Sequence, residues 1–313
     1  MLDLKRKKIL ITGSNGFLGK HLVDNLLNKR MINKNNLFLP SSKELDLTKW
    51  ENCQKAVINQ DVVINLAAKV GGIGYNRQNP GKLFYENLII GAQMMEAARL
   101  AKVKKFIALG TICSYPKVIP VPFKEENLWN GYPEETNAAY GLAKKMMLVQ
   151  AQAYRQQYKF NAIYLMLVNL YGPGDNFDKN RSHVIPALIE KIYWAKKNSQ
   201  DRVIIWGNGR ATREFLYVKD AAEAILLATE NYDKADPINI GSGKEILIKD
   251  VVKIICRLMD YHGKIVWDKS KPNGQPRRNL NVDKAKREFG FKAKKSFEQG
   301  LKDTISWYLT TKT

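Results

Sequence analysis

The chain has 313 residues, of which 45% are hydrophobic and 26% are charged, with a formal net charge of +21. This composition is that of a globular protein long enough for two lobes. No apolar run reaches the roughly 18 residues of a membrane span, and the first residues lead into a strand without a signal peptide, so we expect a cytoplasmic protein with no membrane partner.

The cysteines and the positive charge both bear on partners. Cys53, Cys113 and Cys256 are too few and too scattered for a disulfide framework or a zinc cluster, so we expect no metal. The lysines are spread along the chain and form no single basic arm. We therefore expect no nucleic-acid partner, and a basic surface that suits anionic small ligands.

The first predicted element is an apolar strand over residues 8–12, and a predicted helix over residues 20–27 follows it closely. Between them lies a glycine-rich turn, GSNGFLG. Glycines at this spacing let the backbone approach a pyrophosphate, whose charge the helix N-terminus favours. The predicted dinucleotide contacts in this turn are Gly13, Ser14, Asn15, Gly16, Phe17, Leu18 and Gly19.

A second predicted strand, over residues 36–39, is followed by Ser41, Ser42 and Lys43. Proteins that bind NAD usually place an acid here against the ribose 2'-hydroxyl, whereas hydroxyls and a cation suit the 2'-phosphate of NADP. The sequence therefore favours NADPH, although the nearby Glu44 leaves NADH open.

Two further apolar strands are predicted over residues 61–68 and 105–110, with a helix over residues 84–101 between them. Short apolar strands that alternate with helices are typical of an α/β fold with a parallel, doubly wound Rossmann sheet. Ligands in such sheets bind at the carboxyl ends of the strands. Thr111 and Cys113 come directly after one of these ends.

The spacing Tyr-x-x-x-Lys occurs at Tyr140/Lys144, Tyr193/Lys197 and Tyr308/Lys312. On a helix, positions i and i+4 share a face, so both groups can reach one ligand. A neighbouring cation lowers the phenol pKa from its usual ~10, and the phenol can then give its proton to a carbonyl oxygen. Only Tyr140 follows the strand that delivers Thr111, whose hydroxyl can donate to the same oxygen. We therefore expect Thr111, Tyr140 and Lys144 to form a reductase site.

This set resembles the site of the extended short-chain dehydrogenase/reductases, which use a Ser or Thr, a Tyr and a Lys. From about Lys8 to the C-terminal segment, the chain is also similar, in order and spacing, to the GDP-L-fucose synthases of that family. The segments that carry this resemblance are NLAAKVGGI (65–73), LGTICSYPK (109–117), ETN (135–137), NLYGPGDNF (169–177), SHVIPAL (182–188), WGNG (206–209), REFL (213–216) and KPNGQPRR (271–278).

The resemblance implies a two-stage reaction. Cys113 and His183 would be the acid/base pair that epimerises C3 and C5 of a GDP-4-keto-6-deoxy sugar, and NADPH would then reduce C4 with Tyr140 as proton donor. Both carbons flank the ketone, so their protons are acidic, and Thr111 can help to stabilise the enolate. The resemblance also implies cofactor contacts from Asp46, Leu47, Leu66, Ala67, Ala68, Lys144, Asn169, Leu170 and His183.

The resemblance further implies a homodimer and a discontinuous division of the chain. Residues 1–175 and a return segment, 206–240, would form the NADP-binding domain, whereas 176–205 and 241–313 would form the GDP-sugar lobe. The residues expected to hold the GDP half of the substrate are Val184, Leu188, Lys191, Trp206, Arg213, Asn273 and Arg278.

Three departures from the family pattern keep alternatives open. Thr111 replaces a more usual Ser, Ser114 follows the cysteine, and residues 167–168 are Leu-Val where Pro-Thr is typical. The substrate could therefore be a GDP-4-keto-6-deoxy-heptose, turned over by a 4-reductase with little epimerase activity. A nucleotide-sugar 4,6-dehydratase is disfavoured, because Ile112 and Cys113 stand where its Asp-Glu pair would be. A non-catalytic nucleotide-binding regulator is disfavoured by the complete Thr/Tyr/Lys set.

Overall fold

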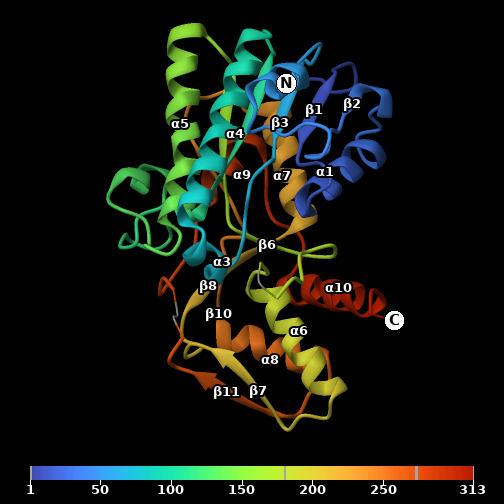
Figure 1. The fold of residues 1–313 in the computed structure, drawn as a ribbon, viewed down its shortest axis with the longest axis vertical. Helices are drawn as coiled ribbons and strands as arrows, with labels where there is room; N and C mark the ends of the chain where they lie inside the picture. Colours follow the sequence, from blue (N-terminus) through green and yellow to red (C-terminus); the bar gives the residue numbers. More distant parts are fainter. Residues whose placement is uncertain (1, 180, 272–273, 313) are drawn as a thin grey trace.

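The larger lobe is built on a six-stranded parallel sheet (Figure 1). The structure is a computed structural model that describes residues 2–179, 181–271 and 274–312. The strands of the sheet are β1 (Ile9–Thr12), β2 (Leu37–Phe38), β3 (Val62–Asn65), β4 (Lys105–Thr111), β5 (Ala162–Leu167) and β9 (Ile238–Ile240). Their spatial order is β2-β1-β3-β4-β5-β9, which confirms the predicted doubly wound Rossmann sheet.

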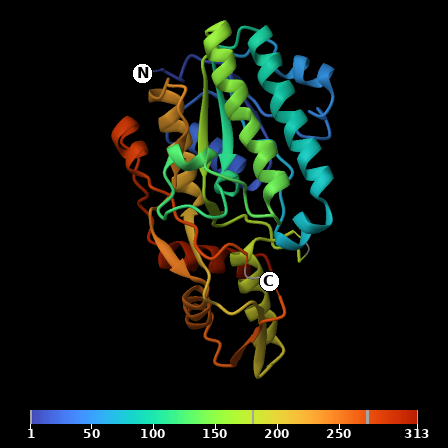
Figure 2. The ribbon, with the colours of Figure 1, turned by 90° about the vertical axis from the view of Figure 1, so that its left-hand side faces the viewer.

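Helices cover both faces of this sheet, as the apolar character of its inner strands requires. Figures 1 and 2 show the long pair α4 and α5 side by side on one face. Three short 3₁₀ helices, η1 (Lys34–Asn36), η2 (Ile112–Ser114) and η3 (Glu125–Trp129), lie in the connections. The α-helices are α2 (Trp50–Ala56), α4 (Pro80–Leu100) and α5 (Ala138–Tyr158) on one face, α1 (Phe17–Asn28), α7 (Val218–Asn231) and α9 (Asp283–Phe289) on the other, and α3 (Ile73–Gln78) near the smaller lobe.

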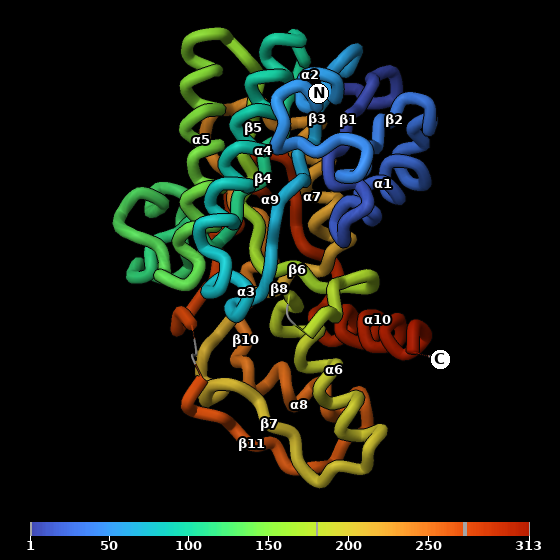
Figure 3. The backbone as a smooth tube through the Cα atoms, viewed as in Figure 1, coloured from blue at the N-terminus to red at the C-terminus, as the bar shows by residue number. Residues whose placement is uncertain are grey.

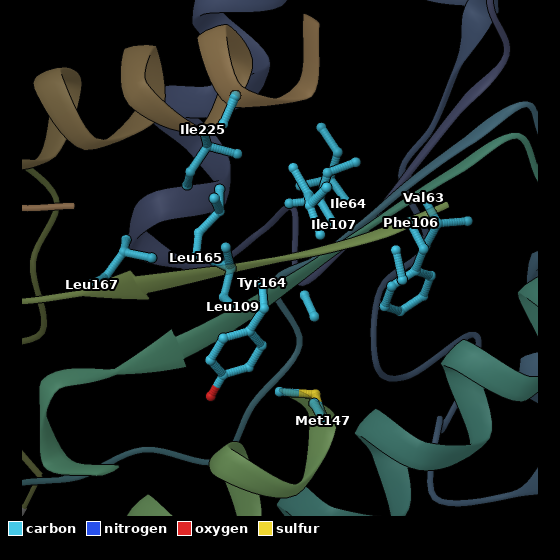
Figure 4. Packing of buried hydrophobic residues seen from close by; sticks show 14 of the residues in the cluster. Val63, Ile64, Phe106, Ile107, Leu109, Met147, Tyr164, Leu165, Leu167 and Ile225 are labelled. Atoms are coloured by element: carbon cyan, nitrogen blue, oxygen red, sulfur yellow. The ribbon is translucent and has the colours of Figure 1, made fainter. Parts of the chain in front are cut away.

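The core of the larger lobe is formed where both helical layers meet the sheet (Figure 4). Ile64 and Ile107 come from neighbouring strands and are fully buried. Ile225 of α7 and Met147 of α5 approach these strands from opposite sides. Because this burial fixes each strand on both faces, the residues that follow the strand ends are held in fixed positions.

The smaller lobe has its own core, beneath the sheet edge where the strands end (Figure 3). Its three-stranded sheet has the order β10-β8-β6, and two further strands, β7 and β11, pair in parallel. The elements of this region are β6 (Asn169–Tyr171), α6 (Val184–Lys197), β7 (Arg202–Trp206), β8 (Thr212–Tyr217), β10 (Glu245–Leu247), α8 (Ile248–Leu258), β11 (Lys264–Asp268) and α10 (Phe297–Thr310).

The other two Tyr-x-x-x-Lys spacings lie in the aromatic part of this smaller core. Tyr308 is 1% exposed and stacks on Phe177 with ring centroids 4.3 Å apart. Tyr193 meets Tyr308 edge-on at 5.4 Å. Lys197 and Lys312 lie over the rings of Tyr193 and Tyr308, respectively. These two tyrosines therefore serve packing.

The two hydrophobic cores divide the chain differently from the sequence-based expectation. Phe215 and Tyr217 of β8 pack in the smaller core, whereas Leu216 packs in the larger one. Leu280 and Phe289 also belong to the larger core, although the expectation assigned all of residues 241–313 to the substrate lobe. We propose that the return segment begins near residue 216 and that residues 280–291 belong to the larger lobe.

A buried carboxylate, Glu214, joins the segments that run between the lobes. It accepts hydrogen bonds from the backbone N–H groups of Gly243 (2.7 Å) and Leu280 (2.6 Å) and from the side-chain amide of Asn279 (3.3 Å). Its burial raises its pKa to about 7. Glu214 therefore links β8 to two distant parts of the chain at one point.

Across the described part of the chain, helices of sufficient length lack the apolar character that crossing a bilayer would need. The same residues contain no cluster of three or more His, Cys, Asp or Glu side chains with metal-site geometry.

Candidate active site

The glycine turn after β1 exposes the N-terminus of α1. Gly13 has a φ of +68°, and its carbonyl accepts a hydrogen bond from the Gly16 N–H at 3.0 Å. A Cβ at Gly19 would overlap the Gly13 carbonyl, so only glycine lets the helix start so close to the strand. The Ser14 hydroxyl is buried and has no hydrogen-bond partner among the described residues. An open helix N-terminus with a spare hydroxyl fits a dinucleotide pyrophosphate.

The segment after β3 lies against this turn. Thr12 donates its hydroxyl to the Asn65 side chain at 2.6 Å and accepts a hydrogen bond from the Ala67 N–H at 3.0 Å. A Cβ at Gly13 would lie only 3.0 Å from that same backbone nitrogen. The predicted cofactor residues Leu66, Ala67 and Ala68 are therefore brought beside the glycine turn.

The turn after β2 presents the predicted 2'-phosphate residues. Glu44 accepts a hydrogen bond from the Ser41 N–H at 2.7 Å, and its own N–H donates to the Ser41 hydroxyl at 3.3 Å. These hydrogen bonds hold the pKa of the Glu44 carboxyl below its usual value. Glu44 is thus engaged within the turn, while Ser42 and Lys43 are exposed. Further along, Asp46 accepts hydrogen bonds from Thr48, and Leu47 is buried in the core.

The turn after β4 carries Thr111 and Cys113 and packs tightly against α5. The Thr111 hydroxyl accepts a hydrogen bond from the Cys113 N–H at 3.2 Å, and the Ser114 hydroxyl donates to the Gly141 carbonyl at 2.7 Å. A Cβ at Gly141 would overlap the carbonyl of Cys113. Glycine at this position therefore brings the first turn of α5, with Tyr140, against the turn that holds the hydroxyl and the thiol.

The pKa expected for Tyr140 is wrong in direction. Burial raises it above its ordinary value, and the neighbouring Cys113 adds to the increase. Burial also lowers the pKa of Lys144 to about 8, because this side chain is only 4% exposed. Removing both groups from water penalises their charged forms more than the cation favours the phenolate. Tyr140 therefore keeps its proton at neutral pH, and Lys144 is cationic below about pH 8.

His183 comes from the other lobe, at the N-cap of α6. The Gly72 N–H donates to the Arg181 carbonyl at 3.1 Å, and a Cβ at Gly72 would press on the Ser182 carbonyl. A loop of the larger lobe thus holds the segment before His183. His183 itself is exposed to solvent, yet the protein atoms around its ring partly desolvate it and lower its pKa. The predicted cofactor residues Asn169 and Leu170 lie on β6 of the same region.

The residues expected to hold GDP separate into two groups. Lys191 lies 5.5 Å from the ring centroid of Trp206, which is 52% exposed, and Lys271 lies over the same ring at 5.6 Å. A pocket of about 1120 Å³ adjoins Lys191 between α6 and β7. Val184 is half-buried at the start of α6, whereas Leu188 is buried in the smaller core.

The second group consists of Arg213 and Arg278, which lie close to Cys113. Arg213 donates to the backbone carbonyls of Thr212 and Gln275, both at 2.6 Å. Burial, together with the positive charge of Arg278, lowers the Arg213 pKa to about 10. Arg278 Nη1 lies 3.4 Å from the Cys113 sulfur. The remaining predicted contact, Asn273, lies outside the described residues.

Sequence reasoning missed the contact between Arg278 and Cys113. The resemblance singled out Arg278 as a GDP contact, but no sequence signal placed its guanidinium against the Cys113 sulfur. Arg277 forms an exposed ion pair with Glu245, whereas Arg278 is 6% exposed.

The model of the NAD dependent epimerase/dehydratase family matches residues 9–241. The chain belongs to this family. The glycine turn, Thr111, Tyr140 and His183 lie within the matched residues. Arg278 lies beyond them.

Individual relatives of this family extend the similarity to nearly the whole chain. The GDP-L-fucose synthase of Sinorhizobium fredii is 39% identical over 303 residues, which are 96% of this chain and 95% of the relative. The GDP-6-OMe-4-keto-L-xylo-heptose reductase of C. jejuni has a TM-score of 0.91 and 30% identity, with 99% of each chain covered. The GDP-mannoheptose C4 reductase of Campylobacter jejuni, with NADP bound, has a TM-score of 0.88 and 30% identity, covering 97% of this chain and 99% of that one.

The contact at Gly141 can be tested by adding a single methyl group. We expect Gly141→Ala to lower the free energy of unfolding by about 1–3 kcal/mol, because the new Cβ must displace α5 from the Cys113 carbonyl. Chemical denaturation measures this change. The matched control is Gly81→Ala in α4, where a Cβ would meet nothing within 4 Å. The control should leave stability unchanged or raise it by up to about 1 kcal/mol, and equal losses in both variants would contradict the proposed contact.

Proposed function

We propose that this chain is an NADPH-dependent enzyme that epimerises C3 and C5 and then reduces C4 of a GDP-4-keto-6-deoxy sugar. The observation that carries this proposal is the packing of Gly141 on Cys113, which brings Tyr140 beside the turn that holds Thr111. A retained phenol proton, a hydroxyl and a thiol at the end of β4 suit acid–base chemistry around a ketone. The 39% identity to a GDP-L-fucose synthase over nearly both full lengths supports the same reaction.

The residues of the chain fit NADPH. The N-terminus of α1 and the spare hydroxyl of Ser14 suit the pyrophosphate, and Ser42 and Lys43 suit the 2'-phosphate. Lys144, cationic below about pH 8, suits the nicotinamide ribose. When bound, this cofactor supplies a hydride for C4. A related C4 reductase with NADP bound supports the choice.

Epimerisation is assigned to Cys113 and His183. Cys113, whose sulfur Arg278 contacts, acts as the base that takes a proton from C3 or C5. The electron pair of the broken C–H bond moves to the C4 oxygen, where the Thr111 hydroxyl stabilises the enolate. His183 returns a proton to the opposite face of the carbon; desolvation lowers its pKa, so its charged form is the minor one at neutral pH but gives up its proton readily. The carbonyl re-forms, and exchange with solvent restores the starting protonation states of both residues.

In the reduction, Tyr140 gives its proton to the C4 oxygen as the C4 carbon is reduced. Its raised pKa keeps that proton in place until negative charge develops on the substrate oxygen. The Thr111 hydroxyl donates a hydrogen bond to the same oxygen. Lys144 is assigned to the nicotinamide ribose. Its backbone carbonyl accepts a hydrogen bond from the Tyr164 hydroxyl at 2.8 Å, which fixes this part of α5.

The GDP half of the substrate is assigned to the smaller lobe. The exposed ring of Trp206 offers a stacking surface for the base, and Lys191 and Lys271, which flank the ring, offer positive charge to the diphosphate. The pocket beside Lys191, which Ser182 and Ile204 also line, gives the nucleotide room beside the segment that precedes His183.

A second candidate is a 4-reductase of a GDP-4-keto-6-deoxy-heptose with little epimerase activity. The similarity to two Campylobacter heptose reductases favours it. The departures at Thr111, Ser114 and residues 167–168 support it as well, since all three fall in the segments that surround the sugar and the nicotinamide. Deuterium exchange at C3 and C5 separates the two candidates.

We assign the chain to a homodimer that forms through α4 and α5. Large apolar side chains stay exposed along this pair: Phe84, Tyr85 and Leu100 of α4, and Val149 and Tyr158 of α5. A second copy would cover them with the same surface.

A cytoplasmic place of action fits a reaction that consumes NADPH and a nucleotide sugar.

Tyr140→Phe tests the proton donor. We expect turnover of a GDP-4-keto-6-deoxy sugar to fall by about 10³-fold, because the substrate oxygen loses its proton source, while the NADPH dissociation constant changes less than twofold. NADPH oxidation and fluorescence titration measure these two quantities. Tyr193→Phe, which removes a hydroxyl from another Tyr-x-x-x-Lys pair, is the control and should retain full turnover. Unchanged turnover in Tyr140→Phe would rule out the reductase site.

Solvent exchange tests the epimerase step. In deuterated water, the wild-type protein should place deuterium at C3 and C5, as read by NMR, because the abstracted protons equilibrate with solvent. Cys113→Ser and His183→Gln should each lower this incorporation by at least about 10²-fold. Reduction at C4 without deuterium at C3 or C5 in the wild type would instead support the heptose-type 4-reductase.

Lys43→Ala tests the cofactor assignment. We expect the wild type to prefer NADPH over NADH, and the variant to lose about tenfold in kcat/KM for NADPH with little change for NADH, because one charged contact to the 2'-phosphate is lost. Steady-state kinetics with both cofactors measure the preference. Lys34→Ala, an exposed lysine just before β2, controls for net charge. A wild type that favours NADH would overturn the assignment.

A further inference from the structure

Arg278 contacts the catalytic thiol from a buried position. Its Nη1 lies 3.4 Å from the Cys113 sulfur, and the residue is 6% exposed. A guanidinium always carries its charge and presents N–H donors in a fixed plane. The sulfur therefore faces a cation.

Gln275 fixes the orientation of this guanidinium. Its side-chain oxygen accepts a hydrogen bond from Arg278 Nε at 2.8 Å, and its amide donates to the Lys117 carbonyl at 2.9 Å and to the Pro116 carbonyl at 3.4 Å. Pro116 and Lys117 follow Cys113 closely in the chain. Gln275 thus braces Arg278 against the segment that carries the thiol.

Glu134 is the counter-charge of this arrangement. Its carboxylate lies 3.8 Å from Arg278 Nη2, and both side chains are 7% exposed. The same carboxylate oxygen accepts hydrogen bonds from Asn137 at 2.7 Å and from Thr136 at 2.6 Å. Asn137 precedes the first turn of α5, so the acid that balances Arg278 is tied to the helix that carries Tyr140.

We propose that Arg278 is a positioning residue for the thiol: it holds the Cys113 sulfur and stabilises its thiolate, and Glu134 offsets part of that stabilisation. This proposal rests on the proposed epimerase function, and it gives Arg278 a role other than the diphosphate contact expected from the sequence. Among the described residues, Arg213 and Tyr140 also interact with the thiol. Arg213 is a cation like Arg278, so its charge acts on the sulfur in the same direction, whereas Tyr140 stays neutral.

The adjacent Arg277 provides a matched comparison. Its guanidinium pairs with Glu245 at 2.5 Å, and its side chain is 58% exposed. Changing Arg277 removes the same charge one residue away without touching the sulfur. A difference between the two variants therefore reports the local contact and not the net charge of the loop.

The rate of Cys113 alkylation by iodoacetamide, followed by mass spectrometry across pH 5.5–9.5, tests the proposal without substrate. Arg278→Gln should slow alkylation at pH 7 by roughly tenfold and move its midpoint to higher pH, because only the thiolate reacts. Arg277→Gln should leave the profile unchanged. Mass spectrometry separates Cys53 and Cys256 from Cys113. Both should be alkylated slowly, since burial raises the pKa of Cys53 to about 12 and also raises that of Cys256.

Glu134→Gln should act in the opposite direction and speed alkylation at pH 7, since it removes the opposing negative charge. Arg278→Lys should restore part of the wild-type rate because it keeps the cation. Thermal melting and NADPH binding check the fold of each variant, so that faster alkylation in Glu134→Gln is not mistaken for exposure of the thiol by local unfolding. An unchanged profile in Arg278→Gln, or slowing in both variants, would overturn the proposal.

Deuterium incorporation at C3 and C5 connects the thiol to the reaction. Arg278→Gln should lower incorporation by at least the factor by which it slows alkylation. If the wild type incorporates no deuterium while the alkylation profiles behave as expected, the epimerase function fails and the thiolate contact stands. If the wild type incorporates deuterium and Arg278→Gln leaves both measurements unchanged, the function stands and the role of Arg278 fails.

Discussion

The contact between Gly141 and the Cys113 carbonyl is the constraint on which the rest of the site depends. The strand β4 fixes where Thr111 and Cys113 emerge, and the length of α5 packed on α4 fixes the direction of the helix. These two rigid parts can meet only where no side chain separates them. The absence of one Cβ therefore converts two independent elements into a single reaction surface, with Tyr140 immediately before the glycine.

Burial, and not pairing of charges, sets the protonation states at this surface. Tyr140 keeps its proton and Lys144 holds its charge only up to about pH 8, because both side chains have lost most of their contact with water. A guanidinium is different, because it stays charged at neutral pH even where burial lowers its pKa, as it does to about 10 at Arg213. The proposed reaction needs a proton donor and a base side by side, and a buried phenol next to a thiol that a buried arginine contacts would supply both.

The sequence predicted what depends on local pattern and left open what depends on packing. Apolar strands and the turn at Gly13 follow from short-range chemistry, so the Rossmann sheet was predictable, and Tyr140 was separable from its rivals by its place in the chain. The direction of its pKa was not, because an i+4 spacing gives no measure of burial. Nor could sequence order show that Arg278 reaches the Cys113 sulfur, or that Leu280 returns to the larger core. Each of these depends on contacts between residues far apart in the chain.

The carboxylate of Glu214 sets an order for the making of this protein. Its partners include Gly243 and Leu280, which are synthesised well after β8. Until they arrive, the Glu214 carboxylate must stay in contact with water, because it lacks the hydrogen bonds that compensate its burial. The glycine turn and most of the sheet can assemble early, but the lobes cannot lock together until nearly nine-tenths of the chain has been synthesised. The catalytic surface is therefore completed late, when the loop that carries Arg278 reaches Cys113.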